Sequence, residues 1–321
     1  MEGFSEPRCD LAAARCGPRK RWRDIIKKRI SENGEEYTEK NASVYNQRKF
    51  ILTTEEKVMT IGFIGIGNMG GAMLGGAIRS GHFKPEDIYA SDISRDALQK
   101  IKDEYKINTA KDNKEAAGCD MLILAVKPQF LYGVIDDIKD SVSSETLIVS
   151  IAAGQSIEKI ENAFGKKIRL VRVMPNTPAL VGEAMSAISG NENVLPEQMN
   201  TVKEFFECFG KAEIVPEKLM DAVTGVSGSS PAYIFMLIEA MADAAVNAGM
   251  MRSQAYIFAA QAVLGSAKMV LETGLHPGIL KDMVCSPAGT TIEAVKTLED
   301  KGFRSAVMDA IDVCVKKSQS M

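Results

Sequence analysis

The chain has few residues that hold metals, and its cysteines lack the spacing of a metal site. It contains two histidines and six cysteines in 321 residues, and no two cysteines form a CxxC pair. Structural zinc sites need four suitably spaced Cys or His ligands, so we expect no bound metal. Scattered cysteines of this kind are typical of reduced thiols in the cytoplasm, which is where we expect this chain to work.

Three further absences narrow the class of protein. No apolar run reaches the roughly 20 residues that cross a bilayer as a helix. The 39 Lys/Arg and 42 Asp/Glu give a net charge of −3, so no basic field attracts nucleic acid. No Ser-His-Asp arrangement and no paired carboxylates emerge. What remains, 45% hydrophobic and 25% charged residues, is the composition of a globular protein with room for two domains.

Residues 1–58 differ from the rest of the chain. They carry 13 Lys/Arg and 10 Asp/Glu, and their only periodic stretch is a basic helix expected at 19–30. The acidic residues argue against a transit peptide. We expect a disordered extension or an over-extended start, because Met59 stands directly before the first strand.

The most informative segment is Thr60–Gly71, in which an apolar strand leads into G-x-G-x-x-G and then into a helix expected at 68–80. This is the phosphate-binding turn of a dinucleotide-binding unit. Gly65 permits the tight turn, Gly67 lets the backbone approach a pyrophosphate, and Gly70 lets the helix pack on the strand. The N–H groups at the helix start then face an anion. A purely structural turn is the alternative.

From Thr60 onward, strands alternate with helices. We expect strands at 60–65, 87–91, 107–109, 120–126, 146–151, 168–173, 185–189 and 212–215, and helices at 68–80, 94–104, 128–138, 156–163 and 196–208. Apolar strands between amphipathic helices predict a mostly parallel sheet covered on both faces. The fold class is therefore α/β, with a Rossmann-type doubly wound sheet first.

After Glu217 the pattern becomes helical, with helices expected at 217–225, 230–248, 252–273, 277–284, 289–300 and 302–317. The second and third of these are rich in small residues, which let helices approach closely. A helix that is apolar on most sides must be buried. We interpret this as a shared subunit interface, with internal packing as the alternative.

Three candidate residues follow strands at the predicted carboxyl edge, where α/β sheets bind ligands. Lys127, at the end of 120–126, is positioned for phosphates or the nicotinamide ribose; the alternative is a solvated Lys before the helix-starting Pro128. Asn176 lies in a proline-stiffened turn and can bond a carboxamide such as nicotinamide, or serve the turn alone. Asn113 follows the third strand, where it can contact a ribose, although an N-cap role is slightly favoured.

The helical half carries two more motifs. The small and hydroxyl residues of 227–233 could line a ligand site or form a capped turn. In 285–293, Gly and Pro precede a helix whose first N–H groups, near Ala288 to Thr291, favour an anion such as a small carboxylate. The Thr291 hydroxyl could add a hydrogen bond or relay a proton. An ordinary helix start is the alternative.

Together these motifs resemble the pyrroline-5-carboxylate reductase family, from about Met59 to Val315. The segments that carry the resemblance are 62–69, 125–128, 176–178, 221–225, 228–233, 276–278 and 286–291, which agree with the family in order and spacing. The resemblance implies a Rossmann domain at 59–216. It also implies a helical substrate-binding and dimerisation domain at 217–321, of the 6-phosphogluconate dehydrogenase C-terminal-like type.

The resemblance further implies reduction of (S)-1-pyrroline-5-carboxylate to L-proline, the last step of proline biosynthesis, with hydride from NADPH or NADH. A protonated imine is already electrophilic, which agrees with the missing general base. The family's dimers have interlocked helices and often assemble into decamers, and each active site is expected to draw on two subunits.

Site residues carry over position by position. The implied catalytic residues are Thr291 and Lys127. The implied cofactor contacts are Gly65, Ile66, Gly67, Asn68, Met69, Gly70, Asp92, Ser94, Arg95, Asn113, Ala125, Val126, Lys127, Pro128 and Asn176. The implied substrate contacts are Glu217, Ser229, Asp282, Ala288, Gly289, Thr290 and Thr291.

The chain departs from the family pattern at several points. Many relatives have Gly where Ser230 and Ala288 stand, and Met283 replaces a polar residue of some members. Asp92 ends the second strand, where several NADPH-preferring relatives have a small hydroxyl residue. An Asp there bonds a ribose 2′-hydroxyl and repels a 2′-phosphate, while Arg95 offsets part of that repulsion. We expect use of both cofactors with a lean toward NADH.

Two other classes of protein compete with this prediction. A β-hydroxyacid dehydrogenase shares the architecture but needs an active-site Lys, and 227–233 contains none. A non-catalytic dinucleotide sensor or scaffold is the second, and the motifs at Lys127, Asn176 and Thr291 argue against it.

Overall fold

The computed structural model describes residues 59–320. The predictions for residues 1–58, including the basic helix at 19–30, lie outside the described residues. One compact unit contains the described residues 59–264 and 282–320, and residues 265–281 belong to a second unit.

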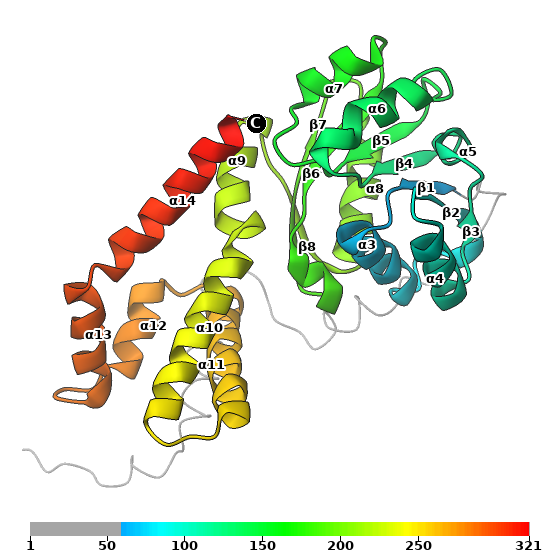
Figure 1. Cartoon of the computed structure of the whole chain (residues 1–321). Coiled ribbons are helices and arrows are strands. Elements are labelled where there is room, and N and C mark those ends of the chain that lie inside the picture. Colours follow the sequence, from blue (N-terminus) through cyan, green and yellow to red (C-terminus); the bar gives the residue numbers. More distant parts are fainter. Residues whose placement is uncertain (1–58, 321) are drawn as a thin grey trace, which may run out of the picture. The chain divides into compact units, whose positions relative to one another are not determined.

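The first part of the chain forms one eight-stranded sheet (Figure 1) with the strand order β3-β2-β1-β4-β5-β6-β7-β8. Reversal of the order at β1 and β4 defines a doubly wound sheet with a ligand crevice beyond the carboxyl ends of these strands. The strands are β1 (Ile61–Ile64), β2 (Ile88–Ser91), β3 (Asn108–Thr109), β4 (Met121–Leu124), β5 (Leu147–Ser150), β6 (Arg169–Met174), β7 (Ala184–Gly190) and β8 (Gly210–Ile214). The predicted Rossmann-type α/β fold is confirmed.

One strand pair departs from the parallel pattern. β6 and β7 pair antiparallel, whereas β7 and β8 pair parallel to each other. The connection from β6 to β7 is residues 175–183, which contain only the 3-10 helix η3 (Thr177–Val181). A parallel crossover needs a dozen or more residues, so this connection reverses the chain instead. The last strand begins at Gly210, earlier than the predicted 212–215.

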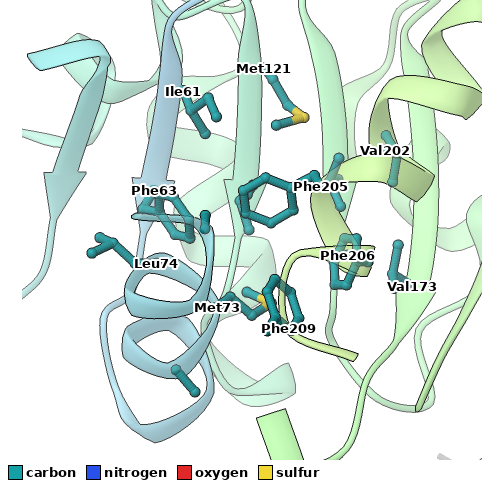
Figure 2. Close-up of a cluster of buried hydrophobic side chains, with 14 of the residues drawn as sticks. Ile61, Phe63, Met73, Leu74, Met121, Val173, Val202, Phe205, Phe206 and Phe209 are labelled. Atoms are coloured by element: carbon teal, nitrogen blue, oxygen red, sulfur yellow. The ribbon is translucent and has the colours of Figure 1, made fainter. Parts of the chain in front are cut away.

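Helices cover both faces of the sheet, as predicted. Alternate residues of β1 and β4 belong to two separate apolar clusters, because side chains alternate along a strand. Figure 2 shows the first cluster, in which Phe205 packs beside Phe63, and Phe206 and Phe209 pack against Phe205. The helices are α3 (Asn68–Arg79), α4 (Arg95–Tyr105), α5 (Asn113–Ala117), α6 (Pro128–Ile138), α7 (Ile157–Phe164) and α8 (Pro196–Glu207), with the 3-10 helix η2 (Pro85–Asp87) before β2.

The two clusters involve different helices. α3 and α8 contribute to the first cluster, while α6 and α7 lie side by side over the second (Figure 1). Burial of each large apolar side chain contributes roughly 1.5–3 kcal/mol, so this sheet is a rigid platform for residues at its edge.

The chain from residue 217 is helical, but its start is not the continuous helix predicted for 217–225. A 3-10 turn, η4 (Glu217–Leu219), leads into α9 (Met220–Val223) and then into a π-helix, η5 (Thr224–Gly228). Ser229 N donates to Thr224 O at 2.8 Å, the bond that spans five residues in a π-helix. The helices that follow are α10 (Ser230–Asn247), α11 (Arg252–Thr273), α12 (Pro277–Val284), α13 (Thr290–Asp300) and α14 (Phe303–Gln319).

These helices bury little of their own surface. Among the residues of α10 only Ala242 is buried, α11 buries only Ala255 and Ala259, and α13 buries none. Large apolar side chains of α10, α11 and α14 are instead exposed: Phe235, Met236, Ile257, Phe258, Met308 and Val313. A surface of this kind marks an interaction site.

Candidate active site

The three glycines of the turn between β1 and α3 are needed for different reasons. Gly65 has φ +94°, and a Cβ there would lie 2.7 Å from Ala125 O. A Cβ on Gly70 would lie 2.2 Å from Gly65 O, so the helix could not pack as closely on the turn. A Cβ on Gly67 would meet no atom within 4 Å. Gly65 and Gly70 are therefore needed by the fold itself, whereas the space beside Gly67 is open to a ligand.

The start of α3 is suited to an anion. The N-cap residue is Gly67, which has no side chain to cap the helix, and the first turn holds no acidic residue. The first N–H groups of a helix have no partner within the helix, and its dipole is positive at that end. The predicted contacts Asn68 and Met69 lie in this first turn, where a pyrophosphate would accept their N–H groups.

A pocket of about 520 Å³ lies on one side of the turn, over the ends of β1, β2 and β4. Its wall combines predicted cofactor contacts with residues of α6 and with two isoleucines after or at the end of strands: Ile64, Gly65, Gly67, Asp92, Ile93, Asn113, Ala125, Val126, Lys127, Phe130, Gly133, Val134 and Asp137. We call it the β2-side pocket. Its apolar walls and acidic end suit a nucleoside.

Asp92 is held in a fixed orientation in the β2-side pocket. Its Oδ2 accepts from Ile66 N at 2.8 Å, and its Oδ1 accepts from Ser94 N at 2.8 Å. The carboxylate therefore lies against the glycine turn, where it places negative charge beside any ribose bound there. Ser94 itself caps α4 by accepting from Ala97 N, and Arg95 is the exposed first residue of that helix.

Asn113 is not the N-cap residue that its position favoured. Asp112 caps α5 by accepting from Glu115 N at 3.0 Å. Asn113 is the next residue, and its Oδ1 accepts from Ser91 Oγ while its Nδ2 donates to Asp137 Oδ2. Asp112 is the N-cap residue because its backbone is extended (φ −150°, ψ −179°), whereas Asn113 is already the first residue of the helix. Asn113 instead helps to shape the β2-side pocket.

A second pocket of about 550 Å³ lies on the other side of the turn, toward β5 and β6. We call it the β6-side pocket, and it is lined by Gly67, Asn68, Met69, Ala125, Val126, Lys127, Pro128, Ile151, Ala152, Ala153, Met174 and Pro175. Gly67, Ala125, Val126 and Lys127 line both pockets. Exposed Lys127, the N-cap residue of α6, thus stands where the two pockets meet.

The side-chain amide of Asn176 already makes two hydrogen bonds to the protein backbone. It is 8% exposed; its Oδ1 accepts from Met185 N at 2.9 Å and its Nδ2 donates to Ser227 O at 3.1 Å. Pro231 lacks the N–H that would bond Ser227 O four residues back in an α-helix. Asn176 supplies the missing donor. The predicted cofactor contact is therefore also a structural link between β6 and the π-helix.

Glu217, a predicted substrate contact, is likewise hydrogen-bonded to other residues of the protein. Its Oε1 accepts from Ile157 N at 2.7 Å and from Arg172 Nη1 at 3.0 Å. Arg172 lies on β6, is 8% exposed, and was not predicted as a site residue. The signal that could have found it is its charge within an otherwise apolar strand.

The predicted substrate segment lies at the start of α13. Ala288 has φ 54°, a left-handed conformation that suits glycine better than alanine. Gly289 is the N-cap residue and makes no side-chain capping bond, so the N–H groups of Thr290 and Thr291 at this helix end suit an anion. Neither pocket at the sheet edge is lined by Asp282 or by residues 288–291. Ser229 lies at the end of the π-helix, where its Oγ accepts from Cys314 Sγ at 3.1 Å.

Residues 59–320 contain no group of His, Cys, Asp or Glu that could hold a metal ion. In the same residues, no helix is both long enough and apolar enough to cross a membrane. A doubly wound sheet with an open glycine turn, an aspartate after β2 and a lysine after β4 defines a dinucleotide-binding α/β protein.

Comparisons with known proteins identify the family. Residues 217–321 match the family described as pyrroline-5-carboxylate reductase dimerisation, and residues 60–154 match NADP oxidoreductase coenzyme F420-dependent. The chain is 53% identical to the pyrroline-5-carboxylate reductase of Escherichia coli K12 over 262 residues, which cover 81% of this chain and 97% of that enzyme. The enzyme of Methanosarcina acetivorans is 49% identical over the same share.

Solved structures agree with the sequence comparison. The pyrroline carboxylate reductase of Plasmodium falciparum, solved with NADP bound, is 32% identical with a TM-score of 0.76, covering 83% of this chain and 99% of that one. The enzyme of Coxiella burnetii is 34% identical with a TM-score of 0.77, covering 82% and 98%. The chain belongs to the pyrroline-5-carboxylate reductase family. The resemblance of its motifs to that family is thereby confirmed.

Proposed function

We propose that this chain reduces (S)-1-pyrroline-5-carboxylate to L-proline with a nicotinamide dinucleotide, the last step of proline biosynthesis. The observation that carries the proposal is the 53% identity with the Escherichia coli enzyme over 97% of its length. The open glycine turn and the two pockets that meet at Lys127 support it, because they can hold a dinucleotide across the carboxyl edge of the sheet. Such a cofactor, when bound, supplies hydride to the imine carbon.

The residues of this chain bind and orient the reactants. The first N–H groups of α3 would hold the pyrophosphate of the cofactor, and Lys127, at the junction of the pockets, would contact its ribose. The N–H groups near Ala288 to Thr291 bind the substrate carboxylate, and the Thr291 hydroxyl hydrogen-bonds the ring nitrogen. No strong base is needed, because the protonated imine is already electrophilic.

One assay tests this function. The purified protein is mixed with pyrroline-5-carboxylate and NADH or NADPH, and the loss of absorbance of the reduced cofactor is followed. We expect rapid oxidation that depends on the imine, with proline as product. Oxidation of 3-hydroxy acids with no imine reduction would instead indicate a β-hydroxyacid dehydrogenase. Binding of the cofactor with neither activity would indicate a sensor or scaffold.

We propose that both cofactors are used, with a lean toward NADH that Asp92 produces. Its carboxylate, fixed by Ile66 N and Ser94 N, would lie beside the ribose 2′-position. A 2′-phosphate carries about −1.5 to −2 charges at pH 7 and would be repelled.

We therefore expect kcat/KM for NADH to equal or exceed that for NADPH, and Asp92→Ser to shift the ratio roughly tenfold toward NADPH, about 1.4 kcal/mol. The measurement is steady-state kinetics at saturating imine. Asp96→Ser is the matched control, because it removes the same charge in the first turn of α4 outside the β2-side pocket. A tenfold preference of the unmodified protein for NADPH would contradict the proposed lean.

The role of Thr291 is tested by Thr291→Ala. We expect kcat/KM for the imine to fall tenfold or more, a loss of about 1.4 kcal/mol of transition-state stabilisation. Thr297→Ala is the control: it removes the same hydroxyl from α13, but that hydroxyl donates to Glu293 O within the helix. Unchanged kinetics in Thr291→Ala would remove this residue from the mechanism.

We propose that the active form is a homodimer with interlocked helical domains, which could assemble further into a decamer. The exposed apolar side chains of α10, α11 and α14 support the dimer, as does the match of residues 217–321 to a dimerisation family. We also propose a domain boundary between residues 216 and 217, with residues 1–58 outside both domains. A cytoplasmic location is supported by the free thiols of Cys119, Cys208, Cys285 and Cys314.

A further inference from the structure

Arg172 is a buried cation that the mechanism above does not use. It lies on β6, 8% exposed, and its guanidinium forms an ion pair with Glu217 at 3.0 Å. Glu217 belongs to η4, some 45 residues further along the chain. A buried guanidinium needs a partner, and loss of either member leaves an uncompensated charge. The pair therefore holds η4 in one position against β6.

The same carboxylate oxygen also holds a third segment. Glu217 Oε1 accepts from Ile157 N at 2.7 Å, and Ile157 is the first residue of α7. The loop before α7 begins with Ile151, Ala152 and Ala153, which line the β6-side pocket. One carboxylate thus joins β6, η4 and the end of a pocket-lining loop, and Arg172 is the charged group that keeps the carboxylate there.

The end of β6 and the turn after it make two more contacts to the helical segment. Arg172 and Met174 alternate along β6, so their side chains share a face, and Asn176 follows two residues after the strand ends. Asn176 donates to Ser227 O, and Met174 Cε lies 2.6 Å from where a Cβ on Gly228 would stand. Met174 also lines the β6-side pocket. The wall of this pocket is therefore the surface that Arg172 and Asn176 tie to residues 217–228.

We propose that Arg172 is a positioning residue for imine reduction. By fixing the Glu217 carboxylate it holds the loop at 151–156, the end of β6 and η4 in register, and so sets the shape of the β6-side pocket, which on the proposed function would hold the nicotinamide. The β2-side pocket shares no wall with these segments, so the nucleoside end of the cofactor does not depend on Arg172. This inference rests on the proposed function of the same site.

The experiment compares Arg172→Met and Arg172→Lys with the unmodified protein, well below the melting temperature of each. The measured quantities are kcat and KM for pyrroline-5-carboxylate, and Kd for NADH from its fluorescence. We expect Arg172→Met to lower kcat/KM for the imine roughly ten- to hundredfold, the scale of a misplacement near 1 Å, while Kd for NADH changes less than about twofold. Arg172→Lys keeps the charge but not the guanidinium geometry, so it should lower kcat/KM for the imine less than Arg172→Met does, roughly two- to fivefold, at unchanged NADH affinity.

Arg169→Met is the matched control. Arg169 lies on the same strand and pairs with Glu145 at 2.8 Å, but at the other end of β6. Its removal should leave both kinetics and NADH affinity unchanged.

The outcomes separate this inference from the proposed function. An unmodified protein without imine reduction overturns the function itself. Unchanged imine kinetics in Arg172→Met, even with a lower melting temperature, overturns only the positioning role, and so does an equal loss of NADH affinity. If Arg172→Met does not fold, Arg172→Lys decides: reduced kcat/KM for the imine at unchanged NADH affinity supports the role, and unchanged kinetics overturns it.

Discussion

Replacing Gly67 with valine is expected to abolish dinucleotide binding while the fold survives. Gly67 is exposed, its φ of −59° suits any residue, and a Cβ there meets no atom within 4 Å. The added isopropyl group would instead occupy the space beside the first N–H groups of α3, where the pyrophosphate must approach. Titration of NADH fluorescence should show Kd raised at least about 100-fold, or about 2.7 kcal/mol, with little change in melting temperature.

Gly70→Ala is the matched counterpart, because it changes the other half of the same turn. Its methyl group would lie 2.2 Å from Gly65 O, a contact that only movement of the helix can relieve. We expect a loss of stability of roughly 2 kcal/mol or more, typical of overpacking. The two variants together distinguish a glycine that the ligand needs from one that the fold needs. Unaltered NADH affinity in Gly67→Val would contradict our interpretation of the turn.

Replacing Ile257 with glutamate is expected to dissociate the dimer and abolish activity with it. Ile257 lies in α11 and is 68% exposed in the single chain, in a helix with only Ala255 and Ala259 buried. A carboxylate buried in an apolar interface without a partner costs several kcal/mol. Light scattering and sedimentation should show the dimer dissociation constant raised at least about 100-fold. Activity should fall because each site is proposed to draw on both subunits.

Leu195→Glu is the control for this experiment. Leu195 is also exposed, at 43%, but it precedes α8 in the sheet-containing part of the chain. The same added charge there should leave the dimer and its activity unchanged. A dimer that survives Ile257→Glu at micromolar concentration would show that this face of α11 does not form the interface.

Elements set by local sequence were predicted closely. α11 and α12 begin and end at the predicted residues, 252–273 and 277–284, and α6 does so at 128–138. Capping residues, Pro128 at a helix start, and continuous apolar strands all act within a few residues of where they appear in the chain. The glycine turn was predictable for the same reason, because its geometry depends on neighbouring residues.

The interactions that could not be predicted from the sequence join residues that are far apart in the chain. Arg172 and Glu217 meet across 45 positions, and the exposed or buried state of each follows only from the assembled fold. Asn176 was predicted as a ligand contact, yet its amide bonds Met185 N and Ser227 O. Asp112 rather than Asn113 caps α5, since two adjacent cap-forming residues cannot be ranked without the backbone angles. The type of such a residue shows which interactions it can make, but which residues it interacts with depends on how the fold brings distant segments together.

The π-helix at Thr224–Gly228 sets the rotation of α10 about its axis relative to α9. An α-helix advances about 100° per residue, and a π-turn accommodates one residue more than an α-turn. Side chains of α10 therefore point about 100° away from where an uninterrupted α-helix from α9 would aim them. Removing one residue from this turn would rotate Phe235 and Met236 off the exposed apolar face without altering any side chain on it. The length of this segment is thus as constrained as its composition.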